Sequence, residues 1–353
     1  MDVIDKPVSV REGEELDTGK VEAYLKDTIP GLEGALTVRQ FPSGYSNLTY
    51  MIEVGKSEMV LRRPPFGRKA KTAHDMGREY RILSAINPVF PYAPRPLAYC
   101  DEESVMGCPF YVMERIQGIV IRKDLPPGLS FSRDEAGKLC KNLLDVQREL
   151  HAVDYKAIGL DGFGKPEGYV KRQVEGWSER YRQARTPDAP DCERVMQWLH
   201  DMMPGEAQRS SIIHNDYKLD NVVLSPANPL EIIGVLDWEM ATIGDPLMDL
   251  GSSLGYWVEE HDPPDLHAMR MMPTNLPGML TRAEMVRRYE KKSGITIGTI
   301  DFYFCFGLFR LAVIAQQIYY RFYHGQTKDK RFQMLIFAVK ILDDTAQGVI
   351  RRG

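Results

Sequence analysis

Residues 214–250 of the chain, HNDYKLDNVVLSPANPLEIIGVLDWEMATIGDPLMDL, contain the pattern from which the fold can be predicted. His214, Asp216 and Asn221 form H-x-D-x-x-x-x-N, between a short apolar pair and the apolar run VVL. A second apolar run, IIGVL, ends at Asp237. A loop with strands on both sides can hold these polar groups in a fixed relation. The simpler alternative is an ordinary turn at a strand end, capped by Asn221. We prefer the first interpretation because several motifs agree.

These residue types suit phosphoryl transfer, in which negative charge develops and a magnesium ion neutralises it. Magnesium takes hard oxygen ligands, few of them from protein, and Asn221 and Asp237 offer such oxygens. Asp216 is the candidate acceptor for the proton of an attacking hydroxyl group. Lys218 follows closely enough to contact the transferred phosphate. The sequence therefore predicts catalytic residues at His214, Asp216 and Lys218, and metal ligands at Asn221 and Asp237.

Two motifs carry a family resemblance. HNDYKLDN resembles the catalytic loop of the protein-kinase-like superfamily at His214, Asp216 and Asn221. LDWEMATIGDPLMDL resembles the aminoglycoside phosphotransferase and choline kinase branch, in which Asp-Trp or Asp-Phe replaces Asp-Phe-Gly. The resemblance implies ATP and Mg²⁺ as cofactors. It also implies that Asp249 steadies the catalytic loop and that Asp245 begins a helix as its N-cap.

A narrower resemblance rests on these motifs together with LRRPP and FRLAVIAQQI. The chain is similar to the kinase-like domain that is fused to some acyl-CoA dehydrogenases. That subgroup is associated with phosphorylation of the hydroxyl groups of hydroxyacyl compounds. No dehydrogenase domain is expected within these 353 residues.

Strand patterns dominate the first third of the chain, and helical patterns dominate the rest. This order predicts the α+β class, and the resemblance implies a bilobal protein-kinase-like fold. Residues 1–115 are expected to form a β-rich nucleotide-binding lobe, and 116–353 a helical lobe with the catalytic loop and substrate site. Strands are predicted at 35–41, 50–54, 59–63, around Tyr99 and at 110–113, and helices at 21–25, 72–86, 131–151, 169–185, 191–202, 283–293, 302–323 and 330–348.

The segment FPSGYSNLTY, residues 41–50, is the candidate phosphate-covering loop. Gly44 allows the backbone to approach a phosphate, and Ser43, Ser46 and Asn47 add short polar groups. The alternative is a plain hairpin turn.

Arg62 stands where protein kinases have a lysine on the third strand. Arginine keeps the charge and can form a fork onto phosphate oxygens. Val60, on the same face, would cover the adenine, and Glu79 on the next helix is the expected partner of Arg62. The alternatives are an exposed strand arginine and a solvated helix glutamate. Arg63, on the opposite face, is expected to be solvated.

The segment FYVMERIQG, residues 110–118, resembles a kinase hinge. Met113 would guard the nucleotide pocket, while Glu114 and Ile116 would offer backbone groups to adenine. The alternative for Met113 is an ordinary core position.

The acceptor is expected to be a hydroxyl group of a small molecule. No A-P-E motif follows Asp237, which argues against a protein substrate. An acidic and aromatic rim could hold a cationic acceptor such as an aminoglycoside or amino alcohol, although a solvated charged loop is preferred. Its residues are Tyr256, Trp257, Glu259, Glu260, Asp262 and Asp265. A hydroxyacyl acceptor would need a basic or apolar site, with Arg310 as a candidate. Pairing of Arg310 with a core acid is preferred, and His151 is expected to pack at a helix end.

The composition is that of an ordinary globular protein, with 43% hydrophobic and 27% charged residues. A net charge of −4 gives no reason to expect nucleic acid as a partner. The five cysteines contain no CxxC pair, so a reducing cytoplasm is the simplest setting. The acidic start predicts no signal peptide, and Arg310 inside the apolar 302–320 stretch argues against a membrane span. A nucleotide-binding pseudokinase is the main alternative to an enzyme.

Overall fold

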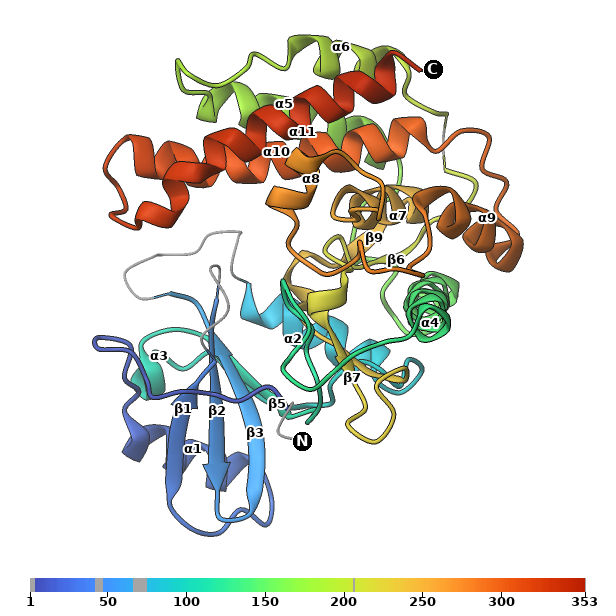
Figure 1. Cartoon of the computed structure of the whole chain (residues 1–353). Helices are drawn as coiled ribbons and strands as arrows, with labels where there is room; N and C mark the ends of the chain where they lie inside the picture. The colour runs from blue at the N-terminus through green and yellow to red at the C-terminus, as the bar shows by residue number, and fades with distance from the viewer. Residues whose placement is uncertain (1–3, 42–46, 66–74, 206, 353) are drawn as a thin grey trace. The chain divides into compact units, whose positions relative to one another are not determined.

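The computed structural model describes residues 4–41, 47–65, 75–205 and 207–352 (Figure 1). The chain forms two compact units. Unit 1 comprises Met1–Val120 and Asn221–Ala241, and unit 2 comprises Ile121–Asp220 and Thr242–Gly353.

Unit 1 is built on a five-stranded antiparallel sheet with the strand order β1-β2-β3-β5-β4. Helix α1 packs its buried Val21 and Leu25 into the apolar cluster on this sheet. Helix α2 contacts β4 and β5. The elements are α1 (Thr18–Thr28), β1 (Leu36–Gln40), β2 (Leu48–Val54), β3 (Ser57–Arg63), α2 (Met76–Ile86), β4 (Pro96–Cys100), α3 (Glu103–Met106) and β5 (Phe110–Glu114).

The hairpin between β2 and β3 has a tight turn. Val54 pairs with Ser57, which leaves two residues in the turn, and Gly55 adopts φ +60°. A Cβ at Gly55 would lie 2.2 Å from the carbonyl oxygen of Glu33, so only glycine fits there. The turn fixes the β2–β3 register, which pairs Arg62 with Thr49.

The hairpin of β7 (Val222–Leu224) and β8 (Ile232–Val235) belongs to unit 1. The Ile119 N–H donates to the Leu224 carbonyl at 2.9 Å, and the Val235 N–H donates to the Tyr92 carbonyl at 2.7 Å. The predicted division, with one boundary after residue 115, did not place residues 221–241 with the N-terminal unit. The hairpin is joined to the N-terminal segment by backbone hydrogen bonds between residues far apart in sequence.

Unit 2 is mainly helical. Its elements are α4 (Arg133–Ala152), α5 (Tyr169–Ala184), α6 (Glu193–Asp201), β6 (Ser211–Ile213), β9 (Thr242–Gly244), α7 (Pro246–Gly255), α8 (Pro264–Met269), α9 (Arg282–Ser293), α10 (Asp301–Tyr323), the 3₁₀-helix η3 (Lys330–Met334) and α11 (Leu335–Ile350). Strands β6 and β9 pair antiparallel. Helix α10 runs beside α11 in Figure 1 and also packs on α7 and α5.

Helix α10 is long and apolar enough to cross a membrane by length and composition alone. However, 78% of its most apolar window is buried inside the protein. This burial is what the polar residues within the predicted 302–323 helix led us to expect.

Three predicted helices differ clearly from the structure at their ends. The helix predicted at 21–25 is longer and runs as α1 from Thr18 to Thr28. The helix predicted from residue 72 begins as α2 at Met76, because the side chain of Asp75 accepts a hydrogen bond from the Arg78 N–H at 2.9 Å and caps it. The helix predicted at 330–348 begins as a 3₁₀ turn, and the α-helix runs from Leu335 to Ile350. Helices α3 and α8 were not predicted from the sequence, because both are too short to show a helical period.

Helices α7 and α10 cross at glycines. A Cβ on Gly251 would lie 2.3 Å from the carbonyl oxygen of Tyr303, and one on Gly307 would lie 2.1 Å from the carbonyl oxygen of Gly251. Backbone atoms therefore occupy the space that any side chain would need, and the close approach positions the start of α7.

We predict that Gly251→Ala destabilises the protein by about 3 kcal/mol, the upper end of overpacking penalties, because backbone must move to admit the methyl group. Thermal unfolding followed by circular dichroism would measure the loss. Gly298→Ala is the matched control, since no atom of the described structure lies within 4 Å of the added methyl group. Equal melting temperatures for the two variants would contradict the prediction.

Candidate active site

A buried carboxylate holds the backbone of the predicted catalytic loop in unit 2. Asp249, on α7, is fully buried and accepts hydrogen bonds from the His214 N–H at 3.2 Å and the Asn215 N–H at 2.6 Å. Asn215 adopts φ +64°, a left-handed conformation that these two hydrogen bonds help to stabilise. Asp249 therefore lies where the resemblance implied, and Asp245 caps α7 as expected by accepting from the Leu247 N–H at 2.8 Å.

Helix α4 supplies further donors to Asp249. His151 Nε2 lies 2.9 Å from Asp249 Oδ2, and Gln147 Nε2 donates to the same oxygen at 3.2 Å. Burial by itself would raise the pKa of Asp249, but these contacts and the neighbouring His214 outweigh it and lower that pKa. The prediction that His151 is only a packing residue was incomplete. Its other ring nitrogen lies 2.7 Å from the Tyr289 hydroxyl, so both nitrogens have polar partners.

The fixed loop presents an acid next to a cation. Lys218 Nζ lies 3.1 Å from Asp216 Oδ2 and 3.6 Å from Asp220 Oδ1. The Asp216 N–H donates to His214 Nδ1 at 3.3 Å, which links His214 to the turn. Lys218 also lies over the Tyr256 ring, 4.9 Å from its centroid. Burial opposes the charge of Lys218, but Tyr256 and the two aspartates outweigh it and raise the pKa of Lys218.

Unit 1 contains a buried arginine between three acids. Arg62, 6% exposed, is ion-paired with Glu79 and donates to Asp237 Oδ1 at 2.8 Å. Its Nη2 also lies 3.6 Å from Glu239. Burial by itself would lower the pKa of Arg62. Glu79, Tyr111 and the other two acids outweigh burial, so the pKa of Arg62 is raised above its ordinary value. The exposed-strand alternative for Arg62 and the solvated alternative for Glu79 are both wrong, because each side chain is buried in this cluster.

Sequence reasoning missed one member of this cluster. Glu239 also accepts a hydrogen bond from Asn47 Nδ2 at 2.6 Å, so it connects Asn47 to Arg62. The one feature of the sequence that could have indicated Glu239 is its place in the D-W-E run, two residues after Asp237. Arg63 was expected to be solvated, but it is 5% exposed and donates to the Pro64 carbonyl at 3.1 Å.

The predicted metal ligands Asn221 and Asp237 flank the β7–β8 hairpin, one directly before β7 and the other two residues after the end of β8. The Leu236 N–H donates to the Asn221 carbonyl at 2.8 Å, so the backbones beside the two residues are joined. Asp237 adopts φ +66° and its side chain keeps 35% exposure. An amide oxygen and an accessible carboxylate are hard donors, and two protein ligands suit magnesium that also binds phosphates. The residues therefore fit this ion.

The predicted hinge residues Met113 and Glu114 end β5, Ile116 follows that strand, and Val60 lies on the neighbouring β3. Val60 pairs with Met113, and both are buried. The Glu114 N–H donates to the Arg95 carbonyl at 2.9 Å, so this N–H already has a partner. Ile116 packs against Gly234 on β8, where a Cβ would lie 2.8 Å from its side chain.

Of the predicted phosphate-loop residues, only Asn47 lies within the described part of the chain. Ser43, Gly44 and Ser46 lie outside the described residues.

The acidic loop that was considered for a cationic acceptor is already paired with arginine. Arg282 donates to both carboxylate oxygens of Asp262, at 2.8 Å and 2.6 Å, and lies 3.2 Å from Glu259. Arg133 lies 3.6 Å from Glu260. These contacts occupy three of the acids that a cation would need.

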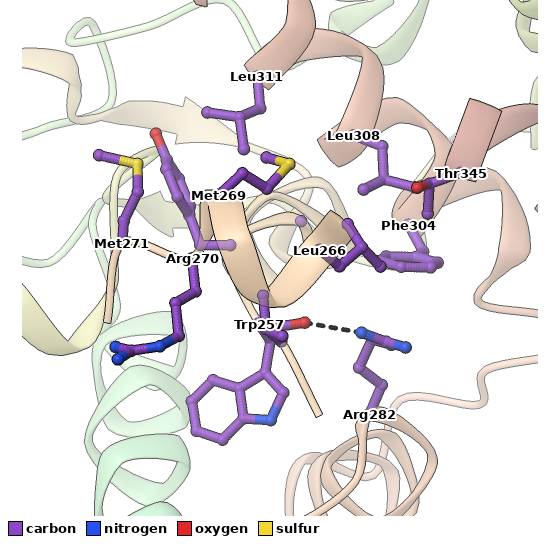
Figure 2. Close-up of a pocket in the computed structure, with 13 residues that line it drawn as sticks. Trp257, Leu266, Met269, Arg270, Met271, Arg282, Phe304, Leu308, Leu311 and Thr345 are labelled. Atoms are coloured by element: carbon purple, nitrogen blue, oxygen red, sulfur yellow. Dashed lines mark hydrogen bonds between the residues drawn. The ribbon is translucent and has the colours of Figure 1, made fainter. Parts of the chain in front are cut away.

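A pocket in unit 2 adjoins the residues that contact Lys218. Figure 2 shows its apolar wall, to which Leu266, Met269, Phe304, Leu308 and Leu311 contribute. Tyr256 also lines the pocket, and the same ring contacts Lys218. The pocket therefore lies next to the catalytic loop within one unit.

Comparison with known proteins agrees with this geometry. The sequence matches the phosphotransferase enzyme family over residues 37–279, so the chain belongs to that family. Acyl-CoA dehydrogenase family member 10 of Mus musculus is 36% identical over 327 residues, which are 92% of this chain and 30% of that protein. The chain spans less than half the length of the curated relatives it matches first.

Solved structures place the fold in the same family. A Ralstonia eutropha protein, solved as a candidate aminoglycoside phosphotransferase, superimposes with a TM-score of 0.81 at 30% identity, covering 96% of this chain and 99% of that one. A thermostable aminoglycoside phosphotransferase mutant bound to ADP and hygromycin B gives a TM-score of 0.59 at 14% identity, covering 94% and 98%. The predicted resemblance and the kinase-like fold are confirmed.

We predict that Asp249→Asn lowers stability by about 3 kcal/mol at neutral pH, since it removes one partner from a buried charged network. Asp145→Asn is the matched control, because its pair with Arg288 is partly exposed and contributes less. Melting temperatures would show the difference.

The pH dependence of this effect has a defined sign. Because folding lowers the pKa of Asp249, its contribution is complete above the ordinary value of 3.8 and is lost as pH falls through the lowered pKa. The gap between wild type and Asp249→Asn should therefore narrow only in acid. A gap that narrows between neutral pH and 3.8 would contradict the assignment.

Proposed function

We propose that this phosphotransferase moves the γ-phosphate of ATP to a hydroxyl group of a small molecule. The observation that carries the proposal is the fixed loop in which Asp216 lies 3.1 Å from Lys218. Asp216 takes the proton of the acceptor hydroxyl, and Lys218 stabilises the charge that develops on the transferred phosphate. His214 and Asp249 hold the backbone of the loop in place for this step.

The residues of unit 1 act on the nucleotide. Arg62, anchored by Glu79, offers its guanidinium to phosphate oxygens. Asn221 and Asp237 would hold Mg²⁺, which neutralises phosphate charge when bound. Val60 and Met113 bound the adenine. Ile116 offers backbone groups to it, and Glu114 offers its carbonyl, since its N–H is bonded to the Arg95 carbonyl. The ADP complex of a structural neighbour supports the choice of nucleotide.

The nature of the pocket favours an acceptor with an apolar segment, such as a hydroxyacyl compound. Its aliphatic and aromatic wall suits a hydrocarbon chain, and the two arginines that also line it, Arg270 and Arg282, do not favour a cationic acceptor. An aminoglycoside or amino alcohol would need free acids, whereas Glu259 and Asp262 are paired with Arg282.

A nucleotide-binding pseudokinase is the second candidate, because arginine replaces the usual lysine at position 62. The ion pair of Arg62 with Glu79 argues against it. The arginine makes the contact for which the lysine is normally needed.

We predict that release of ADP from MgATP requires a hydroxylated acceptor and that Asp216→Ala abolishes it while ATP binding remains. A coupled assay would test hydroxyacyl-CoAs, free hydroxy acids, amino alcohols, sugars and aminoglycosides. Turnover with one class that is lost in Asp216→Ala would support the proposal. Unchanged turnover in that variant would refute the role of Asp216, and ATP binding without turnover on any acceptor would favour the pseudokinase.

We also predict that Arg62→Lys weakens ATP binding by about tenfold, because a single ammonium group replaces a fork that pairs with Glu79 and Asp237 at once. Titration calorimetry with MgATP would measure the change. Arg63→Lys, on the same strand but the opposite face, should bind ATP as the wild type does. Equal affinities for all three proteins would show that Arg62 does not act on the nucleotide.

A further inference from the structure

Arg310 is a buried cation without an acidic partner among the residues that the structure describes. It lies in the middle of α10 and is 4% exposed. The preferred expectation, a pair with a core acid, is wrong. Its guanidinium instead lies over the Trp177 ring of α5, 5.2 Å from the ring centroid. No carboxylate within ion-pair distance of Arg310 occurs in the described part of the chain.

A charge in this position is unfavourable for folding. Removing a charged group from water costs several kcal/mol unless a partner compensates, and a ring contact returns about 2 kcal/mol at most when desolvated. The other buried arginine of the candidate site, Arg62, has three acids around it. Among the described residues, Arg310 contacts the Trp177 ring and no acid, so its charge is not balanced there by a carboxylate.

Arg310 lies within electrostatic range of two tyrosines that contact the catalytic loop. Burial raises the pKa of Tyr256 to about 12, and the positive charges of Lys218 and Arg310 oppose that rise. Tyr169 is affected by Arg310 in the same direction, and its hydroxyl donates to Asn215 Oδ1 at 3.2 Å. Asn215 and Lys218 flank Asp216 in the sequence. The charge of Arg310 therefore acts on two tyrosines that contact the neighbours of the proposed base.

We propose that Arg310 binds an oxyanion of the acceptor, a carboxylate or a phosphate ester, and thereby selects anionic acceptors. The inference rests on the proposed phosphotransfer for its biological meaning, but binding of the anion does not require the transfer step. A planar guanidinium matches both oxyanions by paired hydrogen bonds. The pocket that Tyr256 lines would receive the apolar part of the same molecule.

The test uses the full chain without nucleotide and probes that lack a hydroxyl group. Sodium hexanoate, hexyl phosphate and the neutral hexanamide would be titrated calorimetrically into the wild type, Arg310→Met, Arg310→Lys and Arg180→Gln. Arg180 is the matched control, because it also lies over the Trp177 ring, at 4.8 Å, but is exposed.

We expect hexanoate or hexyl phosphate to bind the wild type and Arg180→Gln, and to bind Arg310→Met at least about tenfold more weakly, the loss for one charge-assisted contact. Arg310→Lys should bind better than Arg310→Met because it keeps the charge. The two anions distinguish a carboxylate site from a phosphate site. Anion binding that is equal in wild type and Arg310→Met, or no stronger than hexanamide binding to the wild type, would overturn the proposal.

Stability provides a second readout. If Arg310 serves a ligand, Arg310→Met should melt no lower than the wild type, because an uncompensated buried charge is removed. A lower melting temperature with unchanged anion binding would assign Arg310 a purely structural role with Trp177. Failure of the proposed phosphotransfer can be distinguished from failure of the anion site by measuring ADP release. If no acceptor supports turnover while Arg310-dependent anion binding persists, the proposed phosphotransfer fails and the anion site stands.

Discussion

The buried carboxylate of Asp249 is the interaction on which the catalytic loop depends. It accepts hydrogen bonds from two consecutive backbone N–H groups of the loop and from side chains of α4. A backbone in the left-handed region at Asn215 would otherwise relax. Because the carboxylate is itself fixed by α7, whose start is capped by Asp245, the position of Asp216 follows from the packing of α7 against α10 through Gly251 and Gly307.

Unit 1 also contains a buried charge that needs polar partners, and in this unit the charge is a cation. Arg62 can remain buried and charged because Glu79, Asp237 and Glu239 surround it. The cluster also joins β3, α2 and the β7–β8 segment, which explains why Asn221–Ala241 belongs to the N-terminal unit. An incoming phosphate would compete with carboxylates for the same guanidinium, so binding exchanges one set of charge-assisted hydrogen bonds for another.

The pocket region of unit 2 differs from the Arg62 cluster of unit 1 in how its charges are paired. Arg282 neutralises Glu259 and Asp262, and the pocket wall beside them is apolar. Arg310 keeps a charge that no acid of the described chain balances, and that charge acts on Tyr256 and Tyr169, which contact the loop. This combination suits an amphipathic anion better than a polyamine, because the positive charge lies deep while the acids are already paired.

The sequence by itself determined the family, the loop of His214, Asp216 and Asn221 between short strands, and most helices. These features depend on residues close together in the chain, such as the spacing of His214, Asp216 and Asn221 or the apolar period of 131–151. Tertiary structure alone decided which charges meet. Glu239 joins Arg62, His151 joins Asp249, and Arg310 meets Trp177 instead of an acid. Such contacts link residues far apart in sequence, and their energies depend on burial, which local patterns do not specify.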